Sequence, residues 1–387
     1  MDNVITTEEL QKSGYTVVAD KTTGKKKSLP WLHLAKFIAI VGMVLVHTFE
    51  ACEEIGENIY DINNIEEWFV EFFGSVPSGV LFMVAMGIGV SLSRKATPQK
   101  YMHRAIQIFL LGILVNVFEK WLPFLYADPS FLLHPASEQF ASIIATDIYS
   151  FATLCMLFFG FLVSTRNPIR VACISLVLAC CAWAYLYQFV ENFTTGSWWL
   201  DNIIGIFLRL NEYSYFSFFP WIIWPLVGFL FGKLWVTHPD TIKRGGRVFL
   251  AGLVAMVIGT VLSICFDSID AVKGKDIEPI DDVYYYSMDG FNLIMAFGLV
   301  SMELAILQAG TEFWGWRIHR IVEFSSKHIM AIYVFQWMLI GLSTPILLCV
   351  DNDWVSLLLG IIIFILTLVC TQLWVRFRTS RKEKANA

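Results

Sequence analysis

The first apolar stretch of the sequence, residues 31–49, carries ionisable side chains of the kind that do chemistry. Lys36 and His47 are eleven residues apart, which on an α-helix is about three turns with about 20° of residual rotation and about 16 Å of rise. Both side chains therefore lie on one face of the predicted helix. Glu50 follows one turn after His47, and an imidazole beside a carboxylate is an arrangement that orients a general base. The sequence offers His47 and Glu50 as candidate catalytic residues and Lys36 as a candidate for binding an anionic group.

Each of these residues also has a structural interpretation. A lysine near the end of a membrane span extends its ammonium group to the interface, and a histidine at the opposite end lies among the lipid headgroups. Glu50 is equally well explained as the first charge of the loop that follows. Position alone therefore does not separate catalysis from membrane anchoring.

Two further polar residues fall within predicted spans. Asp147 lies about eight residues into the predicted span 140–164, at a depth where a carboxylate needs a partner that His47 or Lys36 can supply. Asn116 lies in the predicted span before it. We predict Asp147 as a third catalytic residue and Asn116 as a substrate contact. For both residues the alternative is a structural bond to a neighbouring helix.

A basic patch is predicted on one side of the membrane, from the loop after the second span and the segment before the ninth. Clustered Lys, Arg and His side chains bind multiply phosphorylated ligands through charge-assisted hydrogen bonds. The patch therefore predicts a site for a phosphorylated cofactor, although membrane topology explains such patches as well. Its candidate cofactor-binding residues are Arg94, Arg104, Lys327 and His328, together with Lys36.

These residues require membrane-spanning helices to position them. Of the 387 residues, 56% are hydrophobic and only 16% are charged. A helix that crosses a bilayer needs roughly 20 apolar residues, because its backbone polar groups must be satisfied within the segment. We predict an all-α fold, a polytopic transmembrane helical bundle of about ten spans. The predicted spans are residues 31–49, 76–93, 105–125, 140–164, 169–190, 216–236, 247–266, 291–309, 329–349 and 354–375.

The distribution of basic residues predicts the orientation of the bundle. With the N-terminus inside, 23 of the 28 Lys and Arg residues fall on the cytoplasmic side, as the positive-inside rule requires. Both termini are then cytoplasmic. The predicted organisation is a cytoplasmic tail at 1–29, one membrane domain at 30–376 and a second cytoplasmic tail at 377–387. The charge pattern disfavours nucleic-acid binding, and no metal-ligand spacing is visible.

The order of several short motifs resembles a known superfamily. A basic residue, ten intervening positions and a histidine, here Lys36 and His47, resemble the Arg-x10-His signature of the transmembrane acyltransferase superfamily, which includes the acyltransferase-3 proteins. The signature's arginine is a lysine here, which keeps the charge but loses the bidentate geometry. Three further segments resemble the heparan-α-glucosaminide N-acetyltransferase branch. They are residues 80–94, 104–116 and 322–333.

The resemblance implies a membrane-bound acyltransferase. It would move an acyl group, acetyl above all, from cytoplasmic acetyl-CoA to a hydroxyl or amino group of an outward-facing carbohydrate acceptor, without a metal, in the inner membrane of a bacterium. His47 would deprotonate the acceptor or carry the acyl group, and Asp147 would stabilise its imidazolium form. The expected partners are membrane lipid, acyl-CoA and the carbohydrate, and a homodimer is left open.

Two other classes of function remain open from the residues. A transporter or exporter of a small polar or lipid-linked solute would use the same charges as a proton or substrate relay. A signalling or scaffold protein without chemistry is disfavoured, because Lys36, His47 and Asp147 lie within predicted spans. Binding of CoA from the cytoplasmic side, without dependence on an ion gradient, separates the acyltransferase from the transporter.

Overall fold

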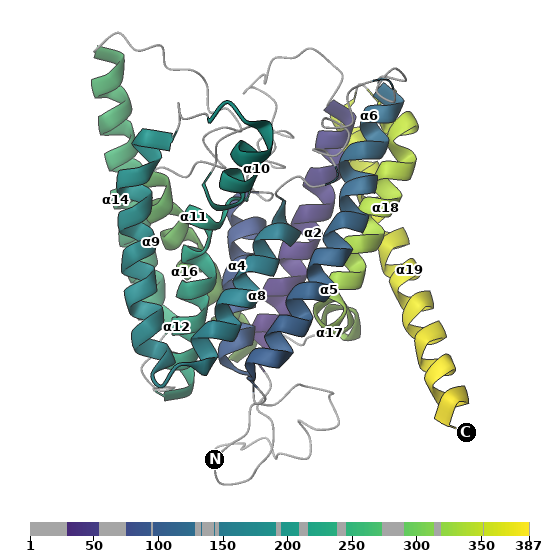
Figure 1. Cartoon of the computed structure of the whole chain (residues 1–387), viewed down its shortest axis with the longest axis horizontal. Coiled ribbons are helices and arrows are strands. Elements are labelled where there is room, and N and C mark those ends of the chain that lie inside the picture. Colours follow the sequence, from purple (N-terminus) through teal and green to yellow (C-terminus); the bar gives the residue numbers. More distant parts are fainter. Residues whose placement is uncertain are drawn as a thin grey trace.

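The computed structural model is a bundle of helices (Figure 1). It describes residues 29–53, 75–93, 96–127, 133, 143, 147–190, 195–208, 216–237, 245–272, 290–312, 319–350 and 352–386. The elements in chain order are α2 (Pro30–Glu53), η1 (Ser75–Val80), α4 (Leu81–Ser91), α5 (Pro98–Asn116), η2 (Val117–Trp121), α6 (Leu122–Ala127), α8 (Ile148–Ser164), α9 (Pro168–Val190), α10 (Trp198–Phe207), α11 (Phe218–Trp221), α12 (Ile223–Thr237), α14 (Gly245–Val272), α16 (Gly290–Glu312), α17 (Arg320–Lys327), α18 (Ile329–Leu347) and α19 (Asp353–Asn386). Every named element in these ranges is a helix, so the all-α prediction is confirmed. The predicted tail at 1–29 lies outside the described residues except for Leu29, and α19 continues through most of the predicted tail at 377–387.

The predicted apolar stretches coincide with helices of the structure. Within the described residues, seven helices are long and apolar enough to cross a membrane, at Pro30–Cys52, Pro98–Tyr126, Phe218–Trp235, Gly245–Cys265, Leu293–Thr311, Ile329–Leu347 and Trp354–Arg381. Shorter apolar helices at Ser78–Ser91, Ile148–Ser164 and Pro168–Ala182 occupy the remaining predicted spans. The chain is an integral membrane protein, while the count of about ten spans stays a prediction.

The structure corrects two details of the predicted elements. Helix α8 begins at Ile148, and Asp147 before it is extended, with φ −105° and ψ −177°. Asp147 therefore precedes the first helical turn instead of lying eight residues inside a helix, in the position before a helix that aspartate favours. The basic segment before the ninth predicted span is a separate short helix, α17, which ends at Lys327.

Helix α2 is the central element of the bundle. It packs against α4, α16, α17, α18 and α19, and Figure 1 shows it between α4 and α18. Ala35, Ala39 and Val44 on this helix are completely buried. Because other helices surround α2, polar side chains along it have protein rather than lipid as neighbours.

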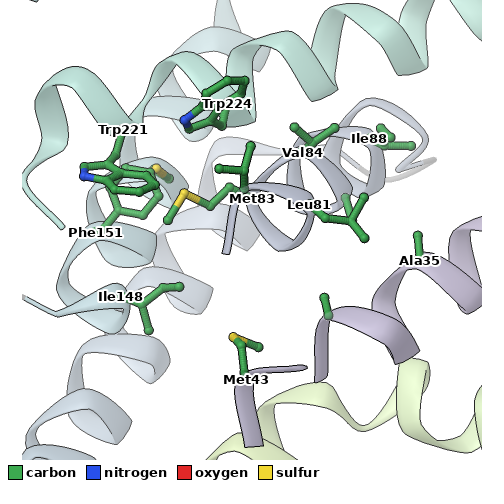
Figure 2. Packing of buried hydrophobic residues seen from close by; sticks show 14 of the residues in the cluster. Ala35, Met43, Leu81, Met83, Val84, Ile88, Ile148, Phe151, Trp221 and Trp224 are labelled. Atoms are coloured by element: carbon green, nitrogen blue, oxygen red, sulfur yellow. The ribbon is translucent and has the colours of Figure 1, made fainter. Parts of the chain in front are cut away.

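The apolar core joins α2 to α4 and α4 to α12. Figure 2 shows Met83 and its neighbours on α4 between Trp221 and Trp224 on one side and Ala35 and Met43 of α2 on the other. All five of these side chains are buried. Helix α4 thus forms the layer against which α2 is positioned.

Two glycines let α4 and α12 approach each other closely. A Cβ atom on Gly87 would collide with the carbonyl oxygen of Pro225, and one on Gly228 would collide with the carbonyl oxygen of Val84. Small residues at such crossings allow membrane helices to pack backbone against backbone. The crossing fixes α4 and, through it, the position of α2.

Contacts to α2 define two ends of the bundle. Near its start, His33 Nδ1 lies 2.8 Å from Ser326 Oγ of α17. Further along, His47 Nδ1 lies 2.6 Å from Gln336 Nε2 of α18. The chain from α17 into α18 therefore passes from the start of α2 toward its end. We name these regions the Lys36 end, which contains the start of α2 and all of α17, and the His47 end, which contains the last turns of α2.

Most basic residues of the described chain lie toward the Lys36 end, and Lys120 at the His47 end is an exception. The asymmetry accords with the predicted cytoplasmic location of the Lys36 end, and the orientation itself stays a prediction. Basic residues at the Lys36 end include Lys100, Arg104, Arg166, Arg170, Lys233, Arg320, Lys327 and those in the last turns of α19.

Cysteine labelling tests this orientation. In a background whose native cysteines are replaced by alanine, we expect Asn352→Cys, at an exposed position before α19, to react with an impermeant maleimide added to intact cells. Thr97→Cys, at the exposed N-cap of α5, should react only after the membrane is permeabilised. Labelling of Thr97→Cys in intact cells would reverse the orientation.

Candidate functional site

His47 is held in place by three side chains of α18. Gln336 Nε2 lies 2.6 Å from His47 Nδ1 and 3.4 Å from the carbonyl oxygen of Met43. Trp337 stacks on the imidazole, with ring centroids 4.4 Å apart and 27° between the planes. Tyr333 meets the ring edge-on, with centroids 6.2 Å apart. The three residues of α18 follow the i, i+3, i+4 spacing of one helix face, so that face fixes the orientation of the imidazole.

A second group of polar side chains lies close to His47, on η2 and at the start of α8. Lys120 Nζ and Glu119 Oε1 form an ion pair at 2.9 Å, and the Glu119 side chain is only 5% exposed. Asp147 is also 5% exposed and lies within electrostatic range of both of these charges. The Lys120 ammonium also acts on His47. We name this group the polar cluster, and it consists of Glu119, Lys120, Asp147 and Tyr149.

Several buried polar atoms around His47 have no hydrogen-bond partner within the described part of the chain. They are Glu119 Oε2, Asp147 Oδ2, the Tyr149 hydroxyl and Trp337 Nε1. The Tyr149 and Tyr333 rings, with centroids 5.1 Å apart, join the polar cluster to α18. An unpaired buried polar group costs about 1–3 kcal/mol, and such groups are rare in folded proteins. Their concentration here indicates a site that a polar ligand completes.

A π-helical turn and a glycine bring the polar cluster to α18. The wider turn η2 follows α5 directly and carries Glu119 and Lys120. The extra residue in a π-turn changes the direction of the side chains that follow, and such turns are frequent at functional sites. On α18, a Cβ atom at Gly341 would collide with the carbonyl oxygen of Phe118. Glycine therefore permits the close contact that places η2 beside α18.

Asn116, the predicted substrate contact, ends α5 just before η2. Its side-chain amide donates a hydrogen bond to the carbonyl oxygen of Ile143 at 2.9 Å. This bond ties α5 to the segment that precedes α8. Asn116 thus lies beside the polar cluster and has a structural bond there.

Lys36 lies at the opposite end of the site, between α2 and α4. Its Nζ would be 4.0 Å from a Cβ atom built on Gly89, so the glycine leaves space around the ammonium group. Arg104 of α5 is close enough to act on Lys36 electrostatically. One turn earlier on α2, His33 bonds to Ser326. Lys36 therefore belongs to a polar region shared by α2, α4, α5 and α17.

The remaining predicted cofactor-binding residues have different surroundings. Lys327 forms an ion pair with Glu323 at 2.5 Å, and Arg104 is exposed on α5. Arg94 lies outside the described residues. Partial burial and the Lys327 ammonium lower the pKa of His328, which stands between α17 and α18, below its ordinary value. Because that ordinary pKa is about 6.5, His328 is largely uncharged at neutral pH, and an anion here would be bound by lysine and arginine.

The structure brings some predicted site residues together and separates others. His47, Asp147 and Asn116 share the His47 end, whereas Lys36, Arg104, Lys327 and His328 share the Lys36 end. Glu50 is exposed beyond His47, and Nδ1 of the imidazole contacts Gln336 instead of a carboxylate. No group of three His, Cys, Asp or Glu side chains among the described residues could hold a metal ion.

Several residues around His47 were not selected from the sequence. A signal existed on α18, where polar and aromatic residues at i, i+3 and i+4 interrupt an apolar span. Glu119 gave no such signal. It stands next to Lys120 near the outer end of the predicted span 105–125, where charged residues are expected at the start of a loop. The residues missed are Glu119, Tyr149, Tyr333, Gln336 and Trp337.

The fold and the site define an all-α integral membrane protein with a histidine-centred polar site inside its helical bundle. The chain belongs to the acyltransferase-3 family, whose acyltransferase domain matches residues 29–375. The match runs from the start of α2 into α19, and the protein is a membrane acyltransferase. The predicted membership of the acyltransferase-3 family is confirmed, whereas the resemblance to the heparan-α-glucosaminide branch stays a prediction. No curated protein and no solved structure matches the chain.

Proposed function

We propose that this acyltransferase moves an acetyl group from acetyl-CoA, bound at the Lys36 end, to a carbohydrate of the cell envelope that binds at the His47 end. The Lys36 end would face the cytoplasm of a bacterium, and the protein would lie in the inner membrane. One observation carries the proposal. The unbroken helix α2 links a basic region to a histidine-centred polar site, and Lys36 and His47 lie on one face of it, about 16 Å apart.

The Lys36 end suits the phosphate groups of CoA. Lys36 and Arg104 act on each other electrostatically, so an anion between them would relieve their repulsion. Lys100 Nζ donates to Ser93 Oγ at 2.7 Å on the same side of the bundle. Charge-assisted hydrogen bonds to phosphate are among the stronger polar contacts in proteins. Lys327 can join this set by exchanging Glu323 for a phosphate oxygen.

The His47 end suits an acceptor that bears hydroxyl groups. Glu119 Oε2 and Asp147 Oδ2, which have no partner among the described residues, can accept hydrogen bonds, and the Tyr149 hydroxyl can both donate and accept them. A sugar offers hydroxyls that can satisfy all three. Its apolar ring face would lie against the aromatic rings of Tyr333 and Trp337. The motif resemblance to an N-acetyltransferase of a polysaccharide supports the same class of acceptor.

The reaction proposed is direct transfer. The acceptor oxygen forms a bond to the acetyl carbon, and the bond from that carbon to the CoA sulfur breaks. The acceptor loses one proton and the sulfur gains one. Asp147, with Oδ2 directed to no protein partner among the described residues, would hold this proton in between, and Glu50 would meet the acceptor as it enters.

Inside-out membrane vesicles provide the test. Vesicles that contain the protein should incorporate label from radiolabelled acetyl-CoA into membrane carbohydrate, whereas vesicles from cells without it should not. Incorporation should persist when an ionophore collapses the proton gradient. A transporter would instead move solute in a gradient-dependent way and leave no covalent label. Absence of covalent label in vesicles that contain folded protein would contradict the proposal.

A further inference from the structure

We infer that Nε2–H of His47 and Nε1–H of Trp337 form an oxyanion site, and that Gln336 positions His47 for this role by fixing the nitrogen that carries its proton. The inference rests on the proposed function, because it assigns the atoms that stabilise the reacting carbonyl group. It changes the expected role of His47 from proton acceptor to hydrogen-bond donor. Gln336 is a positioning residue that acts through His47.

The contacts of Gln336 determine the tautomer of His47. Its Nε2 lies 3.4 Å from the Met43 carbonyl oxygen and 2.6 Å from His47 Nδ1. A backbone carbonyl oxygen can only accept, so the NH₂ group of the amide must face Met43. The second N–H of that group then donates to Nδ1. A ring nitrogen that accepts carries no proton, so the neutral imidazole is protonated at Nε2.

The other nitrogen of the ring is open to substrate. Within the described part of the chain, Nε2 of His47 has no hydrogen-bond partner, and the side chain is half-buried. An Nε2–H group can donate a hydrogen bond to a substrate oxygen. It cannot remove a proton from the carbohydrate hydroxyl unless Nε2 first loses the proton that it already carries. A neutral imidazole can polarise a carbonyl group in this way.

Trp337 supplies the second donor. Its ring stacks on His47 with centroids 4.4 Å apart. Its Nε1 is buried and has no hydrogen-bond partner of good geometry within the described part of the chain, and the Tyr333 hydroxyl lies close enough to interact with it. An indole N–H is only a donor, so the partner it lacks is an acceptor atom. Two preorganised N–H donors on adjacent rings have the composition of an oxyanion hole.

The two donors act where charge develops during transfer. When the acceptor oxygen adds to the thioester carbonyl, the carbonyl electrons move onto its oxygen, which becomes the oxyanion. His47 and Trp337 hydrogen-bond to this oxygen and keep their protons. The charge returns to the carbonyl as the carbon–sulfur bond breaks. The proton of the acceptor passes through Asp147 to the CoA sulfur, so the donors end the reaction unchanged.

Trp337→Phe removes the indole N–H and keeps a ring to stack on His47. Loss of one oxyanion donor reduces kcat by about 10²-fold to 10³-fold, so we expect a fall of about 10²-fold with little change in KM for acetyl-CoA. Trp31→Phe is the matched control, because Trp31 Nε1 is also buried and has no hydrogen-bond partner among the residues that the structure describes, and its ring packs on Trp235 with centroids 5.3 Å apart. Equal rates in the two variants would overturn the role of Trp337.

Gln336→Glu tests the tautomer. The carboxylate would accept from Nδ1–H, move the proton away from Nε2 and abolish the donor, so transfer should fall at least as far as in Gln336→Met. Size-exclusion profiles of both variants report the amount of folded protein. If Gln336→Glu matched or exceeded the wild-type rate, His47 would be a base and the inference would be wrong.

A second readout does not depend on transfer. In the histidine-labelled wild-type protein, the nitrogen NMR spectrum should show His47 protonated at Nε2, and in Gln336→Glu it should show the proton at Nδ1. An Nδ1–H signal in the wild type would overturn the positioning role of Gln336. The wild-type protein could show the Nε2–H tautomer and yet transfer no acetyl group. That result would contradict the proposed function and would leave the tautomer assignment intact.

Discussion

His47→Ala is expected to reduce acetyl transfer by about 10³-fold while leaving acetyl-CoA binding intact. Loss of one oxyanion donor accounts for about 10²-fold to 10³-fold, and loss of a general base would cost a similar factor, about 10²-fold to 10⁴-fold. The substitution also leaves the Gln336 amide without its acceptor, which destabilises the protein by about 1–3 kcal/mol. Initial rates in vesicles, divided by the amount of folded protein, separate the chemical effect from the loss of stability.

His33→Ala is the control for this prediction. His33 is a half-buried histidine on the same helix, and it bonds to Ser326 at the Lys36 end. His33→Ala also removes an imidazole ring, but at a position far from the proposed reaction. The variant should therefore keep most of the wild-type rate of acetyl transfer. A rate for His47→Ala close to that for His33→Ala would remove His47 from the mechanism.

His47→Gln then distinguishes the two chemical roles. A glutamine side chain has N–H donors but cannot take a proton at neutral pH. If His47 is a donor, the glutamine variant should retain clearly more activity than the alanine variant. Equal inactivity of the two variants would favour the base.

The helices could be predicted from the sequence because the bilayer imposes a simple rule. A span needs an apolar run of fixed length with its backbone hydrogen bonds inside it, and the predicted spans coincide with helices in the structure. Short elements outside this rule were missed. Helix α17 is amphipathic and carries Arg320 and Lys327, and the basic segment that contains it has no apolar run that would predict a helix.

The relative position of Lys36 and His47 could also be predicted, because both residues lie on one continuous helix whose geometry is known. The contact between His47 and Gln336 could not, since the two residues are 289 positions apart and meet only after α18 packs on α2. Periodicity describes one helix at a time. It does not specify which neighbour each face meets.

The polar cluster was hidden for a different reason. Glu119 and Lys120 enter the interior on a π-helical turn, and a regular α-helical projection gives the wrong direction for side chains after such a turn. The apolar residues before Asp147 predict a helix that includes it, yet α8 starts one residue later, at Ile148. Local irregularities of the backbone therefore set the geometry at this site.

Lys36→Met is expected to weaken acetyl-CoA binding by about 10-fold to 10²-fold. A hydrogen bond to a charged group contributes about 1.5–3 kcal/mol, and each 1.4 kcal/mol is about tenfold in affinity. Methionine matches the apolar stem of lysine and removes the ammonium group, so packing beside Gly89 should survive. Lys36→Arg keeps the charge and restores the arginine of the Arg-x10-His signature. It should therefore bind acetyl-CoA much better than the methionine variant.

The matched control for Lys36 is Lys233→Met. Lys233 is a half-buried lysine at the same end of the bundle, on α12, and its Nζ lies 5.5 Å from the centre of the Phe229 ring. Titration of each purified variant with acetyl-CoA gives the dissociation constant directly. We expect a large increase for Lys36→Met and little change for Lys233→Met. An equal increase in both would mean that the general positive potential of this end attracts CoA, and no increase in Lys36→Met would exclude Lys36 as a contact of the cofactor.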